Sequence, residues 1–180
     1  MNPRPPHRHL RALLLAGVVA LLTACATPPG IPETTWHRLP AASAAAKLNT
    51  PSALPIVVQR MEADGLHADQ ALLYALDPSG DRLRAYHYNL WVDPPGYLLQ
   101  RRMVQRLRAA GAAERVTDHL PGRPAALWVS GRIERFERVP HAGGGFEAQV
   151  SLRLRVSSRD GRLPLVDGEY ESEERRVGKE

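Results

Sequence analysis

The sequence predicts an α+β fold, a largely antiparallel β-sheet with helical structure packed on it. Two features of the 180-residue chain support this prediction. Short apolar segments, several with apolar and polar residues in alternation, are separated by Pro, Gly, Ser and Asp, a pattern typical of strands joined by tight turns. One longer segment, residues 94–110, instead repeats its apolar residues at helical spacing.

The N-terminus has the pattern of a secretion signal. Residues 1–11 contain Arg4, Arg8 and Arg11 but no acidic residue, and residues 12–22 are wholly apolar. This apolar run is too short for a membrane-spanning helix, which needs about 20 residues. We therefore predict that residues 1–24 are a signal peptide that is removed on secretion.

Cys25 is the only cysteine of the chain, which excludes an intramolecular disulfide. The residues before it, Leu22, Thr23 and Ala24, resemble a lipobox, in which the cysteine sulfur receives a diacylglycerol. Two or more acyl chains such as palmitate anchor a protein stably, because each buried methylene contributes about 0.8 kcal/mol. We predict a membrane anchor at Cys25. The alternative is an idle cysteine behind an ordinary signal peptide.

The charge of the mature chain does not indicate a nucleic-acid partner. Loss of Arg4, Arg8 and Arg11 with the signal peptide lowers the formal net charge from +5 to +2. The remaining arginines are interspersed with acidic residues, as in residues 131–139, GRIERFERV. A nucleic-acid site would need a basic surface with interleaved aromatic residues. We therefore expect a solvated surface of mixed charge.

Residues 25–53 are predicted to be a lipid-anchored spacer with one short strand. Pro28, Pro29 and Pro32 favour an extended chain. Residues 34–39 are the strand candidate, and residues 40–53 are a loop of small residues bounded by prolines.

The folded body begins with strands. Residues 54–61, LPIVVQRM, are apolar and β-branched and predict a buried strand. Residues 71–76 and 83–91 flank the turn-forming segment DPSGD and predict a β-hairpin.

The helix is predicted at residues 94–110. Asp93 is suited to the N-cap, Pro94 to the first helical position and Gly111 to a left-handed stop. Four apolar residues fall within about 80° of the helix circumference and should pack on the sheet, while four polar residues point to water. The apolar set is Leu99, Met103, Leu107 and Ala110, and the polar set is Arg101, Arg102, Gln105 and Arg108.

The C-terminal half predicts further strands at residues 114–116, 126–139, 146–158 and 163–171. The second should contain a bulge near Phe136, and the loop PHAGGG should join it to the third as a hairpin. Residues 159–162, RDGR, should form the next turn. In the third strand one face should be buried and the other solvated. The buried set is Phe146, Ala148, Val150, Leu152, Leu154 and Val156, and the solvated set is Glu147, Gln149, Ser151, Arg153 and Arg155.

Two segments resemble a known family. Residues 61–76, MEADGLHADQALLYAL, and residues 85–111, AYHYNLWVDPPGYLLQRRMVQRLRAAG, are similar to the ABC-type transport auxiliary lipoproteins, the PqiC-like partners of MCE-type lipid transporters in the Gram-negative envelope. Leu90 departs from the pattern, where a basic residue is expected. The matching positions are Asp64, Gly65, Ala68, Asp69, Tyr74, Tyr86, Tyr88, Trp91, Pro94 and Pro95.

The resemblance implies a mixed sheet with helices packed on it, similar to the N-terminal domain of TolB, over residues 54–171. It also implies a non-catalytic docking module that has no cofactor and binds a periplasmic MCE-domain transporter protein. Ala26 after the anchor resembles lipoproteins that pass to the periplasmic face of the outer membrane. Homo-oligomerisation is left open.

A lipid-anchored periplasmic hydrolase acting on envelope material is the alternative function. His87, His119, Asp93, Asp118 and Ser130 supply the side-chain types of a hydrolase triad. However, no GxSxG motif frames a serine nucleophile, and no two histidines have the spacing of metal ligands. We therefore predict no catalytic, cofactor-binding or metal site.

The last nine residues, SEERRVGKE, are the translation of TCG GAA GAG CGT CGT GTA GGG AAA GAG, a run that matches a widely used sequencing adapter. The family that the chain resembles continues into a further C-terminal helix. We therefore predict that residues 54–171 are a C-terminally truncated domain and that residues 172–180 are a non-native tail. A charged helical tail is the alternative.

Replacing the predicted acylation site, Cys25→Ser, should abolish membrane association and leave the signal peptide uncleaved, because no thiol remains to accept the acyl chains. Membrane fractionation and labelling with a palmitate analogue measure both effects. Equal labelling of the variant and the unaltered protein would refute the anchor.

Overall fold

The computed structural model describes residues 30–41, 44–122, 125–158 and 164–176, with the backbone alone for residues 164 and 172–176. The chain divides into two units, Met1–Glu33 and Thr34–Glu180, and every element below belongs to the second. The predicted signal peptide, Cys25, residues 26–29 of the spacer and the turn at residues 159–162 lie outside the described residues.

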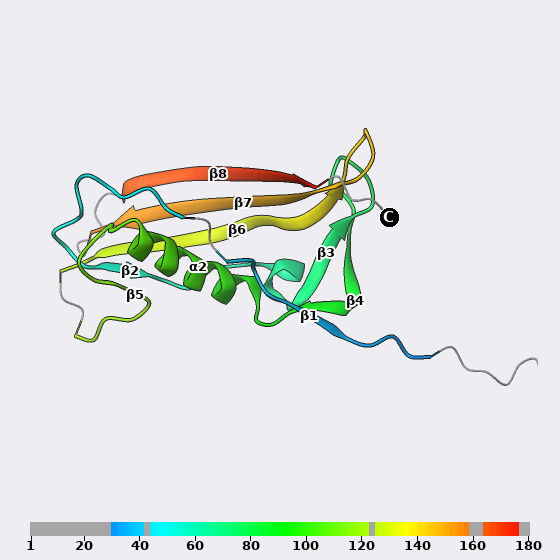
Figure 1. Ribbon diagram of the computed structural model, residues 1–180, viewed down its shortest axis with the longest axis horizontal. Helices are drawn as coiled ribbons and strands as arrows, with labels where there is room; N and C mark the ends of the chain where they lie inside the picture. The colour runs from blue at the N-terminus through cyan, green and yellow to red at the C-terminus, as the bar shows by residue number, and fades with distance from the viewer. Residues whose placement is uncertain (1–29, 42–43, 123–124, 159–163, 177–180) are drawn as a thin grey trace, which may run out of the picture. The chain divides into compact units, whose positions relative to one another are not determined.

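Eight strands of the described residues form one mixed sheet, with α2 packed on one face (Figure 1). This arrangement confirms the α+β class. The strands are β1 (Thr35–His37), β2 (Ile56–Val58), β3 (Ala71–Ala75), β4 (Leu83–Trp91), β5 (Val116–Thr117), β6 (Leu127–Pro140), β7 (Phe146–Ser157) and β8 (Pro164–Arg176), and the helices are the 3-10 helix η1 (Gly65–Ala68) and α2 (Pro95–Ala109).

β6 is the central strand of this sheet. β7 pairs antiparallel with it along its length, and β8 pairs antiparallel with β7. The opposite edge of β6 is shared, because β2 runs parallel to its first part and β3 runs parallel to its last part. Figure 1 shows β6, β7 and β8 as three long neighbours, with the β3–β4 hairpin at the end where β6 finishes.

The chain between β2 and β3 also follows β6. The Glu62 N–H donates to the Gly131 carbonyl at 2.8 Å, and the Ile133 N–H donates to the Glu62 carbonyl at 2.8 Å. These bonds continue the backbone pairing of β6 between the two short strands.

The predicted β3–β4 hairpin is confirmed. Its turn is stabilised by Asp77, whose Oδ1 accepts a hydrogen bond from the Ser79 N–H at 3.2 Å. Hydrogen bonds from Ser79 and then from Arg82 hold the pKa of Asp77 below its usual value. Gly80 lies at φ +75°, a left-handed conformation that glycine adopts without strain.

The start of the helix differs from the prediction. α2 begins at Pro95, its N-cap is Pro94, and no side chain caps it. Pro94 has ψ 143° because a residue that precedes a proline is disfavoured in the helical region. Asp93 therefore lies one residue too early to cap the helix, and its carboxylate pairs with Arg101 instead. The predicted stop at Gly111 is confirmed by its φ of +65°.

The predicted apolar face of α2 packs on the sheet. Leu99, Met103 and Leu107 contact the core cluster that includes Val58 and Phe136. Val104 is also buried, although the prediction did not include it. Arg108 is exposed as predicted, and its Nε donates to the Val116 carbonyl at 2.8 Å.

The alternating pattern of β7 is confirmed in the part of the strand that packs on the core. Four residues of the predicted inner face contact the core cluster: Val150, Leu152, Leu154 and Val156. The prediction was wrong for Phe146 and Ala148, which are exposed because β7 begins beyond the end of α2 (Figure 1). It was also wrong for Ser151, which is 2% exposed: this short side chain lies between the neighbouring strands β6 and β8, and its hydroxyl donates to Glu169 of β8 at 3.3 Å.

The other C-terminal strands match the predictions with small shifts. β5 begins at Val116, and β6 is bulged between Ile133 and Arg135, close to Phe136. The β6–β7 hairpin is confirmed. β8 extends to Arg176, so the backbone of residues 172–176 pairs with β7. That pairing was not predicted, but backbone groups alone can make it.

Close packing surrounds Met61, which lies three residues beyond β2 and is 1% exposed. A Cβ added at Gly96, in the first turn of α2, would lie 2.4 Å from the Met61 carbonyl oxygen. A Cβ added at Gly131 of β6 would lie 2.8 Å from the Met61 sulfur and 2.7 Å from Leu154 Cδ2. These distances are far below normal contact, so both positions require glycine.

The substitution Gly131→Ala should lower the free energy of unfolding by about 1–3 kcal/mol, because the methyl group overpacks the core. Gly168→Ala is the matched control in a strand, since its added Cβ would meet Tyr170 at an ordinary 3.5 Å. The control should change stability by no more than about 0.5 kcal/mol in urea denaturation. Equal effects of the two substitutions would contradict the packing around Met61.

Candidate functional site

A cleft of about 370 Å³ lies between α2 and the segments that follow β1 and β4. We call it the basic cleft. Its polar lining consists of Arg38, Asp93, Arg101, Arg102 and Gln105, and its apolar lining consists of Leu39, Val92 and Leu98. The Arg101 guanidinium pairs with the Asp93 carboxylate, and the Arg102 guanidinium donates to the Pro40 carbonyl.

A second hollow, of about 560 Å³, lies over the β3–β4 hairpin. We call it the tyrosine hollow. Tyr74 from β3 and residues 84–89 of β4 line it. The rings of Tyr74 and Tyr86 have centroids 4.5 Å apart, and Arg138 of β6 donates to the Tyr86 hydroxyl at 2.9 Å. The hollow thus brings together three of the residues that carry the family resemblance, Tyr74, Tyr86 and Tyr88.

The β4 strand beside this hollow has a free edge. β3 pairs with one side of β4, and β1 pairs with the other side only at Asn89, Leu90 and Trp91. Within the described part of the chain, no strand pairs with the outer edge of residues 83–88. Unpaired N–H and C=O groups on such an edge can accept an extended segment of another protein.

Other residues that carry the family resemblance lie in the core, at η1 and at the start of α2. Trp91 packs against the core, with its ring centroid 5.3 Å from that of Phe136. Gly65 lies at φ +53° at the start of η1, and the Asp64 carboxylate pairs with Arg132. Asp69 is exposed at the end of η1, and Pro94 and Pro95 form the start of α2.

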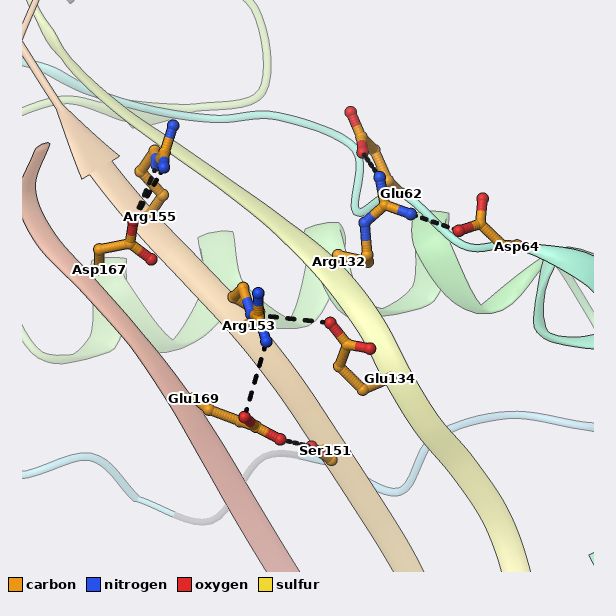
Figure 2. A network of polar contacts seen from close by, with 9 residues as sticks. All are labelled: Glu62, Asp64, Arg132, Glu134, Ser151, Arg153, Arg155, Asp167 and Glu169. Atoms are coloured by element: carbon orange, nitrogen blue, oxygen red, sulfur yellow. Dashed lines mark hydrogen bonds and ion pairs between the residues drawn. The ribbon is translucent and has the colours of Figure 1, made fainter. Parts of the chain in front are cut away.

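Ion pairs cover the face of the β6–β7–β8 strands that lies opposite α2 (Figure 2). Arg132 pairs with Glu62 and Asp64, Arg153 with Glu134 and Glu169, and Arg155 with Asp167. Exposed pairs of this kind contribute little to stability, commonly about 0–1 kcal/mol each. Because every carboxylate in the network has an arginine partner, the network does not resemble the carboxylate pair of an enzyme that uses general acid–base catalysis. It forms the solvated face of the sheet.

The five candidate hydrolase residues do not form a triad. His87 lies exposed on β4, and Asp93 pairs with Arg101. Asp118 and His119 lie exposed after β5, whereas Ser130 lies within β6. No hydrogen bond joins any two of these side chains. Nor does the described part of the chain contain a group of three His, Cys, Asp or Glu residues that could hold a metal ion.

A buried pair that the sequence did not reveal ties η1 to β6. His67 Nε2 lies 3.0 Å from the Glu137 carboxylate, and the two side chains are 16% and 2% exposed. The same carboxylate accepts the Phe136 N–H at 2.5 Å. Glu137 could not be identified from the pattern, because its partner His67 lies 70 positions away in the sequence and the two meet only in the fold.

The described residues thus form a small α+β domain in which one helix packs on a mixed sheet. The model of the ABC-type transport auxiliary lipoprotein component family matches residues 37–177, and the chain belongs to this family. No curated protein matches the chain. Among the residues that the structure describes, no helix is both long enough and apolar enough to cross a membrane.

Two solved structures share the fold. Protein XCC0632 from Xanthomonas campestris, a DUF330 protein, is 15% identical with a TM-score of 0.64, and the alignment covers 77% of each chain. An uncharacterised protein is 14% identical with a TM-score of 0.59, and the alignment covers 83% of this chain and 84% of the other. At these identities the similarity concerns the fold alone.

Removing one hydrogen-bond partner of the buried carboxylate, by His67→Ala, should lower the free energy of unfolding by about 1–3 kcal/mol, because a buried acceptor of Glu137 is left unsatisfied. The control is Glu62→Ala, whose side chain is 71% exposed and should cost no more than about 1 kcal/mol. Urea denaturation of both variants measures the difference. A loss below 1 kcal/mol for His67→Ala would show that Glu137 does not depend on His67.

Proposed function

We propose that this protein is a non-catalytic, lipid-anchored component of an MCE-type lipid transport system, which docks onto the periplasmic MCE-domain transporter protein at the outer membrane. Membership of the auxiliary lipoprotein family supports a role beside a transporter. The proposed anchor is Cys25, and the spacer between it and β1 supplies the reach from the membrane to the domain.

The observation that carries the docking proposal is the free edge of β4 at residues 83–88, next to the tyrosine hollow. An added strand would satisfy the unpaired backbone groups, and the hollow would receive its side chains. Tyr88 is 40% exposed, so it is available to a partner. Tyrosine also supplies a large contact area at a small cost in conformational entropy.

The charge of the hollow indicates the chemistry of the partner. Its lining contains Arg84 and His87 but no acidic residue, and Arg138 lies beside it. An extended segment of the transporter protein that carries acidic and apolar residues would complement this surface. A basic segment would instead be repelled by the arginines at this surface.

The substitution Tyr88→Ala should reduce recovery of the transporter protein at least about fivefold when the tagged full-length protein is purified from membranes, because the variant loses a central aromatic contact. The matched control is Tyr170→Ala on β8, a tyrosine that is 50% exposed and remote from the β4 edge in the sheet order. Both variants should retain most of their thermal stability, since neither side chain belongs to the buried core.

Co-purification of an MCE-domain protein that is lost with Tyr88→Ala and kept with Tyr170→Ala supports the proposal. Purification without any MCE-domain protein would overturn the partnership. Co-purification that survives both substitutions, and also the charge reversal Arg84→Glu, would overturn the assignment of the docking surface.

A further inference from the structure

The basic cleft collects its cations from two distant parts of the chain. Arg38 follows β1 directly, whereas Arg101 and Arg102 belong to α2. On a helix, positions 98, 101, 102 and 105 fall within a sector of about 100°, so their side chains share one face. Three guanidinium groups thus meet one carboxylate, Asp93, and leave a local surplus of positive charge.

The three arginines differ in what they already bind. Arg101 is paired with Asp93, and Arg102 donates to the Pro40 carbonyl. Arg38 is exposed and makes no hydrogen bond or ion pair with the residues that the structure describes. A guanidinium group binds phosphate oxygens with two parallel hydrogen bonds, which makes phosphate a better match for Arg38 than a single carbonyl or hydroxyl. We propose that the basic cleft binds a phosphate group, with Arg38 as its principal ligand.

The apolar part of the lining, which we call the floor of the cleft, indicates what kind of group is attached to the phosphate. Leu39, Val92 and Leu98 form this floor, and Leu98 is 6% exposed. Inorganic phosphate would contact the cationic rim and leave this floor in contact with water. A phospholipid headgroup would place its phosphate on the rim and the glycerol and first methylenes on the floor. The volume of about 370 Å³ falls within the range of small-ligand sites, about 300–1,000 Å³.

The proposed anchor at Cys25 would keep the cleft within reach of a membrane. Thr35 is ten residues from Cys25, and an extended chain of that length spans at most about 36 Å. This step alone rests on the proposed anchor. The phosphate site itself depends on neither the anchor nor a transporter partner.

Isothermal titration calorimetry tests the site on the full-length protein, purified in a non-ionic detergent without phosphate. Three probes are titrated: dihexanoyl phosphatidylglycerol, inorganic phosphate, and dihexanoylglycerol, which lacks the phosphate. The variant Arg38→Gln removes the proposed ligand without breaking a described contact. Arg115→Gln is the matched control, because Arg115 is also exposed but lies beyond the other end of α2.

We expect phosphatidylglycerol to bind, dihexanoylglycerol not to bind, and Arg38→Gln to weaken binding by roughly 10- to 100-fold while Arg115→Gln does not. Inorganic phosphate that binds as tightly as the lipid, with the same loss in Arg38→Gln, supports the phosphate site and identifies free phosphate as its source. Absence of binding by both phosphate probes overturns the proposal, as does an equal loss in the two variants. Purification of the transporter protein with Arg38→Gln distinguishes the two proposals, since docking at β4 should persist in this variant.

Discussion

The arrangement of this domain depends on one close contact, in which Met61, three residues beyond the end of β2, lies between the first turn of α2 and the central strand β6. Met61 donates its N–H to the Gly96 carbonyl at 3.3 Å, and its side chain fills the space above Gly131. Because neither glycine has a side chain, α2 and β6 approach the same segment from opposite sides. The contact sets the position of the helix, and thereby the positions of Arg101 and Arg102 over the cleft.

Most of the local structure could be predicted from the sequence, because it follows from short-range patterns. The turn residues of DPSGD identified the β3–β4 hairpin, and the spacing of Leu99, Met103 and Leu107 identified the packed face of α2. The alternation in β7 identified the residues that contact the core between Val150 and Val156. The same patterns failed at Ser151, which is buried on the face predicted to be solvated, and at Asp93, because Pro95 makes the helix start one residue later than predicted.

The long-range features could not be predicted from these patterns. Hairpin signals indicate antiparallel neighbours, but the parallel pairing of β2 and β3 with β6 depends on which strands the chain places together. The family resemblance identified Tyr74, Tyr86 and Tyr88 as matching positions. It did not indicate that these side chains line one hollow. No pattern linked Arg38 to Arg101, since residues distant in sequence meet only in the fold.

The direction of β1 has a mechanical consequence. This three-residue strand runs parallel to β4, and His37 Nε2 lies 2.9 Å from Asn89 Oδ1. A tensile force on the preceding residues, directed along the strand, slides β1 against β4. All the cross-strand bonds then resist together, whereas a force that peeled the strand away would break them one after another. Under a force in that direction, β1 would therefore behave as a shear joint between the domain and the segment before it.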